Sequence, residues 1–423
     1  MLAVVPPTNR PTWPVLALVT AGMGAGPLLN FGLASTSSLV IATFGLTTAQ
    51  FGLILTVVFA SAAVVSLALG WLADRLAPPA QWGILFGGAA IALGLAGLAP
   101  TYGFLLATAV FSGVSQAMSN PTTNRAVTAL APPAKRIGWI GVKQSGVQVG
   151  QLFAGLAFPG LALWLGWTGA ALAVSALCIA MLVAALTVIP DWTKGTSGVT
   201  ETSPTPTAND VPGTEPATST VAPSPRMVWL IVGMLAALSF LSAFGLMSTN
   251  SYLSLFAVQQ FDYPLVLGGL LVAMGGLIGV ASRIWWAQAL VRGAGAGPLL
   301  VIMSLGSIAA AVCFTVSALA HVDALIWLGV ALHGISVLGA NVVINASVIK
   351  VAGRRRLGLA TGVTSTGLYA GFATGPVLAG AVIDSDVGFT GGWAVIGAAY
   401  VVCLGVALVF SRMTRHLRPP RRR

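Results

Sequence analysis

Charged residues, and acidic residues above all, are scarce in this sequence. Only 9 of its 423 residues are Asp or Glu, and charged residues of both signs make up 7% of the chain. Hydrophobic residues make up 57%, and the mean hydropathy is +0.92. Ordinary soluble domains carry about 25% charged residues, because they need polar surface to face water. The composition therefore excludes a soluble globular protein and indicates a chain solvated mainly by lipid.

Catalytic and cofactor-binding signatures are also missing. The three cysteines, Cys178, Cys313 and Cys403, lie inside apolar runs and form neither a Cys-x-x-Cys pair nor a disulfide framework. The sequence contains no His-Glu-x-x-His, Gly-x-Ser-x-Gly or Walker-type motif. We therefore expect no enzymatic activity, no cofactor, no metal site and no ATP-driven pumping.

The net charge of +11 does not indicate a nucleic-acid-binding protein. The basic residues lie in short connections between apolar runs and in the C-terminal segment 418–423. This is the placement that the positive-inside rule and anionic lipid headgroups predict. We expect the lipid bilayer rather than DNA or RNA as the partner of this charge, and we expect the chain to act as a monomer.

Twelve apolar runs are long enough to cross a membrane as helices, which takes roughly 20 residues each. We therefore predict an all-α integral membrane protein with twelve transmembrane helices. The first helix is expected to be retained, because only Arg10 precedes it and no small-residue cleavage site follows. The runs lie near residues 14–40, 48–72, 82–99, 102–125, 138–162, 168–190, 227–252, 264–290, 297–319, 323–348, 357–383 and 391–411.

The apolar runs fall into two sets of six. Residues 191–226 between them are rich in Thr, Ser, Pro and Gly and cannot bury enough apolar surface to offset the entropy of ordering. The predicted organisation is an N-terminal six-helix bundle (1–190), a disordered cytoplasmic linker (191–226), a C-terminal six-helix bundle (227–411) and a basic cytoplasmic tail (412–423).

Loop charges predict the orientation. In the predicted topology, all Lys and Arg residues of the loops fall on one side of the membrane. The charged residues of the opposite loops are Asp262, Asp323, Asp384 and Asp386. The positive-inside rule makes the basic face cytoplasmic. We expect a multi-pass protein of the inner (plasma) membrane with both termini in the cytoplasm.

The two halves repeat one another. Phe-Gly-Leu-Ala-Ser-Thr-Ser-Ser at 31–38 recurs as Phe-Gly-Leu-Met-Ser-Thr-Asn-Ser at 244–251. Asn120 and Asn124 in the fourth run likewise correspond to Asn341 and Asn345 in the tenth. Both pairs keep the same direction through the membrane, so the repeat is parallel. Parallel six-helix halves place any site in a cavity between them, near the middle of the bilayer.

The sequence resembles the major facilitator superfamily over nearly its whole length. Besides the six-plus-six repeat, positions 70–77 read Gly-Trp-Leu-Ala-Asp-Arg-Leu-Ala, which is similar to that family's Gly-x-Leu-Ala-Asp-Arg-x-Gly-Arg signature. The resemblance implies a latch at Asp74 and Arg75 that holds the cytoplasmic side closed in the outward-facing state. Ala77-Pro78-Pro79 replaces the glycine and basic residue of the signature, which puts the strength of this latch in doubt.

Three basic residues lie in or at apolar runs without any accompanying acid: Arg125, Lys143 and Arg283. Arg283 lies nine residues before Arg292, or roughly 14 Å deeper along its helix, where reaching the interface is difficult. Its guanidinium suits a carboxylate, so we predict an anion ligand. The alternative is a structural arginine bonded to helix carbonyls. Arg125 is expected at the cytoplasmic end, as an interfacial or gating residue.

Lys143 is predicted to approach the same cavity from the opposite half, with Gln144, Gln148 and Gln151 on a neighbouring stripe. The alternative is a lysine that extends to the cytoplasmic interface. Trp285 and Trp286 flank Arg283 and could either form an aromatic wall or face lipid.

Further polar side chains recur at helical spacing inside the apolar runs. The candidates for substrate binding are Asn30, Gln116, Asn120, Asn341 and Tyr369, with helix-to-helix hydrogen bonding as the alternative. His333 could carry a proton or be a hydrogen-bonded packing residue.

These features predict a secondary active transporter that moves a small organic anion of the carboxylate type. The substrate is the expected small-molecule partner, with a proton or counter-anion as the possible coupling ion. The alternatives are an exporter of hydrophobic or drug-like compounds and a non-transporting membrane sensor. Two cations without an acid in the membrane count against a cationic cargo.

Overall fold

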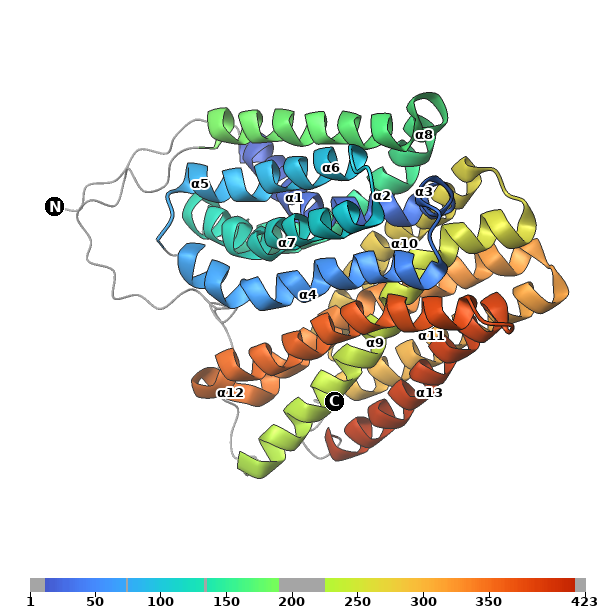
Figure 1. Ribbon diagram of the computed structural model, residues 1–423. Helices are drawn as coiled ribbons and strands as arrows, with labels where there is room; N and C mark the ends of the chain where they lie inside the picture. The colour runs from blue at the N-terminus through green and yellow to red at the C-terminus, as the bar shows by residue number, and fades with distance from the viewer. Residues whose placement is uncertain (1–11, 74, 133–134, 190–224, 415–423) are drawn as a thin grey trace.

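The computed structural model describes residues 12–73, 75–132, 135–189 and 225–414, and these described segments are helical apart from short connections (Figure 1). The predicted all-α class is confirmed. The elements are α1 (Thr12–Ala25), α2 (Leu28–Ser35), α3 (Ser37–Phe44), α4 (Thr48–Ala73), α5 (Pro78–Trp82), η1 (Gly83–Gly87), α6 (Gly88–Gly97), α7 (Tyr102–Leu130), α8 (Arg136–Val188), α9 (Pro225–Phe261), α10 (Leu265–Val291), α11 (Ala296–Ala320), α12 (Asp323–Ile383) and α13 (Gly388–Thr414).

Nine helices in the described part of the chain are long and apolar enough to cross a membrane, or up to ten if the bent pair of α1 and α2 forms one span. Two elements carry more than one crossing. α8 bends at Gly166, whose φ of 65° favours glycine, and α12 contains separate spans at 323–352 and 359–383. α7 has 29 residues but is less apolar than those nine helices, because Gln116 and Asn120 are among its many polar residues. These features fit the expected twelve-span arrangement.

The domain boundaries proposed from the sequence remain predictions, but the helices come close to them. α9 begins at Pro225, two residues inside the predicted linker, and α13 ends at Thr414, inside the predicted tail. Most of the linker and of the tail lie outside the described residues.

Glycines let helices approach closely at equivalent places in the two halves. A Cβ atom on Gly24 of α1 would lie 2.6 Å from the carbonyl oxygen of Gly146 on α8. In the second half, a Cβ atom on Gly375 of α12 would lie 2.5 Å from the carbonyl oxygen of Phe244 on α9. The first and fifth spans therefore pack as the seventh and eleventh do, as the parallel repeat predicts.

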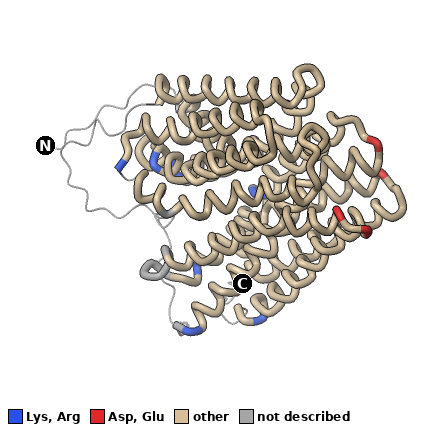
Figure 2. The backbone as a smooth tube through the Cα atoms, viewed as in Figure 1, with Lys and Arg blue, Asp and Glu red and all other residues tan. Residues whose placement is uncertain are grey.

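Charge separates the two ends of the described molecule. Most Lys and Arg positions lie at one end of the backbone tube, and the Asp positions lie at the other (Figure 2). From the bounds of the helices, the basic end carries Arg75, Lys135, Arg136, Arg226, Arg292, Lys350 and Arg412, and the acidic end carries Asp262, Asp323, Asp384 and Asp386. In Figure 1 the helices before residue 190 and those after 224 converge at the acidic end and diverge at the basic end.

Hydrogen bonds between the halves hold the acidic end closed. The carboxylate of Asp384 accepts hydrogen bonds from the backbone N–H groups of Thr48 (2.8 Å) and Ala49 (2.7 Å) at the start of α4. The single hydroxyl hydrogen of Tyr252 on α9 lies between the carbonyl oxygen of Thr48 in the first half (3.1 Å) and that of Pro376 in its own half (2.6 Å). The hydroxyl of Ser254 donates to the carbonyl oxygen of Ser35 at 3.1 Å.

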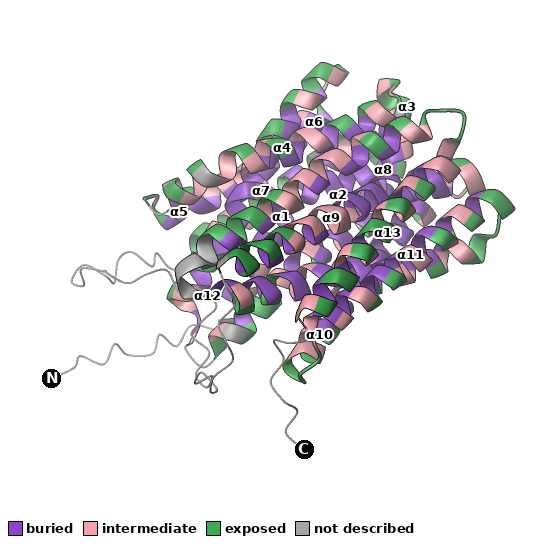
Figure 3. Ribbon diagram, turned by 90° about the horizontal axis from the view of Figure 1, so that it is seen from below, coloured by how far each residue is buried: buried purple, intermediate pink, exposed green. Residues whose placement is uncertain are grey.

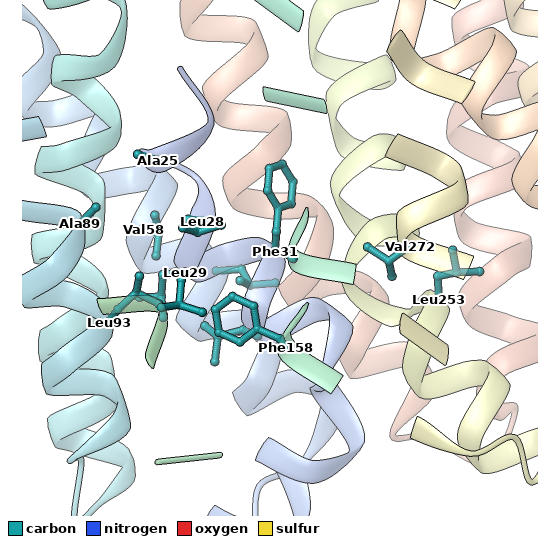
Figure 4. Packing of buried hydrophobic residues seen from close by; sticks show 14 of the residues in the cluster. Ala25, Leu28, Leu29, Phe31, Val58, Ala89, Leu93, Phe158, Leu253 and Val272 are labelled. Atoms are coloured by element: carbon teal, nitrogen blue, oxygen red, sulfur yellow. The ribbon is translucent and has the colours of Figure 1, made fainter. Parts of the chain in front are cut away.

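Buried residues lie mainly where helices face one another, whereas exposed residues lie on the outer surface (Figure 3). Many of the exposed residues are large and apolar. Trp164 is 88% exposed and Val64 is 79% exposed, as expected for residues that face lipid rather than water. The largest buried cluster continues across the boundary between the halves. Phe31 and Phe158 of the first half and Leu253 and Val272 of the second belong to it (Figure 4).

Candidate functional site

A cavity lies between the two halves at mid-helix positions. The volume open to the centres of water-sized molecules in this cavity is about 180 Å³. Its polar lining consists of eight carboxamides, four hydroxyls and one guanidinium: Asn30, Gln116, Asn120, Gln144, Gln148, Gln151, Asn250, Asn341, Ser119, Ser239, Ser242, Tyr369 and Arg283. Its apolar lining includes Met23, Phe31, Phe59, Met247, Ile344 and Phe372. Asn120 and Asn341, which the repeat relates, both contribute, one from each half.

Arg283 is the one charged residue among the described side chains that line this cavity. It extends from α10, and its Nε donates to the carbonyl oxygen of Leu338 at 3.1 Å. Its Nη1 donates to the carbonyl oxygen of Gln144, also at 3.1 Å, in the opposite half. The carbonyl contacts anticipated as the structural alternative therefore exist. These two contacts use only part of the five N–H donors of the guanidinium, and Arg283 lines the cavity.

Lys143 lies behind the cavity wall rather than in it. Its side chain is 0% exposed, and its Nζ donates to Thr123 Oγ1 (2.9 Å) and Asn120 Oδ1 (3.3 Å) and contacts Met23 Sδ (3.7 Å). It therefore neither lines the cavity nor reaches the interface at the basic end. The reason is helical geometry, because Lys143 is rotated about 100° from Gln144 and points towards α1 and α7. Asn120, which accepts its hydrogen bond, does line the cavity.

The carboxamides also join helices, as their alternative role requires. Asn30 Nδ2 donates to Gln116 Oε1 at 3.3 Å, between α2 and α7. Gln151 Nε2 donates to the carbonyl oxygen of Val272 at 3.2 Å, between α8 and α10. The predicted stripe of Gln144, Gln148 and Gln151 lines the cavity as one face of α8.

Several lining residues were not selected from the sequence as site residues. The rings of Phe31, Phe59 and Phe372 line the cavity, but a phenylalanine in an apolar run has no feature that separates a cavity-facing from a lipid-facing position. Trp285 and Trp286, considered for an aromatic wall, do not line it. Trp285 is 54% exposed, and the indole of Trp286 donates to the carbonyl oxygen of Ile335 at 2.6 Å.

The predicted gating residues lie elsewhere. Asp74 is outside the described residues, while the guanidinium of Arg75 stacks on Trp71 at 3.5 Å from the ring centroid. Arg125 Nη1 donates to the carbonyl oxygen of Ala73, which joins α7 to the end of α4. His333 is 2% exposed, does not line the cavity, and has no hydrogen-bond partner on either ring nitrogen within the described structure.

The sequence pattern of the Major Facilitator Superfamily matches residues 28–366. The chain belongs to the major facilitator superfamily. Comparison with curated proteins gives no match. Solved structures of this superfamily fold cover almost the whole chain, and the protein is accordingly a multi-pass membrane transporter of the alternating-access type with a small-molecule substrate.

Three solved structures illustrate the shared fold. A bacterial homolog of the human lysosomal transporter Spinster, inward-facing and unoccupied, has a TM-score of 0.72 and 16% identity, with 96% of this chain and 98% of that chain covered. The same homolog, inward-facing and occupied, gives 0.69 and 16%, with 96% and 97% covered. A mutant of the nucleoside transporter NupG gives 0.69 and 14%, with 95% and 100% covered. At these identities the likeness establishes the superfamily fold alone.

Proposed function

We propose that this chain is a secondary active transporter of a small organic anion of the carboxylate type. The observation that carries the proposal is Arg283, a cation in a cavity whose described lining contains no carboxylate. A guanidinium can hold a carboxylate through two parallel hydrogen bonds, and an anion would supply the counter-charge that the protein does not. The carboxamides Asn30, Gln116, Asn120, Gln144, Gln148 and Asn341 and the hydroxyl of Tyr369 would orient the rest of the molecule.

Lys143 supports the same charge preference from behind the wall. Its ammonium hydrogen-bonds Asn120, so a second positive charge lies one side chain away from the cavity. Coulombic attraction acts across such a separation when little water intervenes. Two cations with no acid beside them favour an anionic substrate over a cationic one.

We further propose that the basic end faces the cytoplasm of a plasma membrane, following the positive-inside rule. The described state, closed at the acidic end, is then inward-facing. The described lining contains no Asp, Glu or His that could carry a coupling proton. The proton would instead cross the membrane on the carboxyl group of the substrate, or a counter-anion would be exchanged for the substrate. The contact of Arg125 with the end of α4 would serve the cytoplasmic gate.

Ligand-dependent thermal stability of the purified protein tests this function. Acetate, benzoate, succinate, sulfate and tetraphenylphosphonium would be added to wild type, Arg283→Gln and the control Arg292→Gln, which alters an exposed arginine on the loop after α10. At about 100 times its dissociation constant, a bound ligand adds roughly 2.7 kcal/mol of stability. We expect carboxylates to stabilise wild type and Arg292→Gln but not Arg283→Gln.

An exporter of hydrophobic compounds is the second candidate, favoured by the phenylalanine and methionine side chains in the lining. Its signature in the same experiment is different. If tetraphenylphosphonium stabilises all three proteins while no carboxylate stabilises any, the organic-anion function is wrong and the exporter takes its place.

A further inference from the structure

Three phenylalanine rings from three different helices meet the cavity. Phe31 lies on α2, Phe59 on α4 and Phe372 on α12. The rings of Phe59 and Phe372 contact each other across the boundary between the halves, with centroids 4.8 Å apart and an interplanar angle of 45°. Phe59 is only 3% exposed. The two halves therefore share one aromatic wall.

This aromatic wall and Arg283 lie at different depths. Phe59 lies eleven residues from the acidic end of α4, and Phe372 eleven residues from the acidic end of α12. Arg283 lies eighteen residues from the acidic end of α10. At 1.5 Å per residue, the backbone of Arg283 is about 10 Å closer to the basic end than the ring pair is. A ligand that spans the cavity meets the cation at one end and the rings at the other.

The ring pair also adjoins contacts between α4 and α12 that lie nearer the acidic end. Beyond it, the hydroxyl of Thr56 donates to the carbonyl oxygen of Ala373. A Cβ atom on Gly52 would lie 2.5 Å from the carbonyl oxygen of Pro376, so the backbones of α4 and α12 touch there. A group that packs on Phe59 and Phe372 therefore packs next to these contacts between the halves.

We propose that Phe59 and Phe372 form an apolar subsite that selects aromatic carboxylic acids, with the ring of the substrate against this pair and its carboxylate towards Arg283. The substrate class rests on the proposed organic-anion function, whereas the subsite rests on the ring contact and its depth. Aromatic groups gain from such edge and offset contacts in addition to apolar burial. A purely hydrophilic acid of the same charge would leave the rings uncovered.

Matched ligand pairs test the subsite. The midpoint concentration for thermal stabilisation would be measured for 3-phenylpropanoate against propanoate, and for the uncharged 3-phenylpropanol. The proteins are wild type, Phe372→Ala, Phe372→Leu, Arg283→Gln and the control Phe240→Ala. Phe240 is a half-buried phenylalanine on α9 that does not line the cavity. Phe372→Leu keeps an apolar side chain of similar bulk, so a loss seen in both Phe372 variants is a loss of the ring rather than of the fold.

We expect 3-phenylpropanoate to bind wild type at least tenfold more tightly than propanoate does. Both Phe372 variants should bind 3-phenylpropanoate about tenfold more weakly than wild type, with the affinity for propanoate unchanged. Phe240→Ala should bind both acids as wild type does. Equal midpoints for the two acids, abolished together by Arg283→Gln, would overturn the subsite and leave the organic-anion function standing. Tight binding of 3-phenylpropanol that depends on Phe372 and not on Arg283 would support the subsite but contradict the proposed organic-anion function. If none of the three ligands stabilises wild type, both are wrong.

Discussion

At the scale of single residues, buried cations without acids distinguish this chain. Arg283 and Lys143 differ in what surrounds them. Arg283 meets two backbone carbonyls and the cavity, whereas Lys143 is enclosed by side chains of α1 and α7. An enclosed ammonium without a counter-charge is costly, because carbonyl and hydroxyl dipoles replace only part of its hydration. Lys143 donates a hydrogen bond to Asn120, which lines the cavity, so its charge can influence the cavity through that side chain.

Lys143→Met should therefore separate stability from binding. We expect the free energy of unfolding to rise by about 1 kcal/mol, because an apolar side chain of similar length replaces an enclosed charge. The affinity for benzoate should fall, because the second positive charge is gone. Thermal unfolding with and without benzoate measures both quantities. Lys350→Met, at an exposed lysine, is the control, and a Lys143→Met protein with wild-type benzoate affinity would show that this charge plays no part in binding.

At the scale of elements, the acidic end is held by a carboxylate at a helix N-terminus. Partial burial raises the pKa of Asp384, but the hydrogen bonds from Ala49 and Thr48 outweigh it and bring the pKa below its usual value. The contact therefore stabilises the closed acidic end at neutral pH. This contribution is lost as the pH falls below about 4, through the lowered pKa of the folded state.

Asp384→Asn should weaken this closure at neutral pH. A neutral amide provides one acceptor oxygen and a weaker interaction with the helix N-terminus than a carboxylate does. Spin labels at positions 43 and 387, both exposed at the acidic end, would report the distance between the halves. We expect longer and broader distances in Asp384→Asn. Asp386→Asn is the control two residues away, and identical distances in all three proteins would contradict a closing role for Asp384.

A second element-scale prediction concerns the packing of α8 on α10. A Cβ atom on Gly155 would lie 2.5 Å from the backbone nitrogen of Ala273 and 2.6 Å from the carbonyl oxygen of Gly269, both in the other half. Gly155→Ala must push the two helices apart and should lower the free energy of unfolding by about 1–3 kcal/mol.

Gly160→Ala is the matched control on the same helix. Nothing lies within 4 Å of a Cβ atom there, so this change should be neutral or stabilise the helix by about 0.5–1 kcal/mol. Thermal unfolding of the two variants in one detergent gives the comparison. If both variants unfold at the wild-type temperature, close packing at Gly155 does not limit the approach of the halves.

At the scale of the whole molecule, the sequence predicts the architecture better than the site. Run length, loop charge and the repeated segments at 31–38 and 244–251 lead to the all-α class and the superfamily, because each follows from lipid solvation or from chain symmetry. The depth of Arg283 and the stripe on α8 follow from helical rise and spacing, and these side chains do line one cavity. That they bind substrate is still a prediction.

What could not be predicted depends on rotation about a helix axis and on contacts between distant segments. Lys143 and Gln144 are neighbours in the chain, yet one is enclosed by its own half and the other lines the cavity. The pairing of Phe59 with Phe372 joins residues far apart in sequence and leaves no local pattern. The sequence around Tyr252 likewise does not predict the hydrogen bond from its hydroxyl to the carbonyl oxygen of Thr48.

The polarity of α7 has a consequence for how this protein is made. A helix leaving the ribosome and the insertion channel partitions into lipid according to its own hydropathy, and α7 is less apolar than the nine long apolar helices of the described chain. Its serine and threonine side chains at 112, 115, 119, 122 and 123 are buried against neighbouring helices. The stability of α7 in the membrane therefore depends on its neighbours, chiefly α4 and α6. We therefore expect α7 to insert into the membrane together with neighbouring helices of the first half rather than independently.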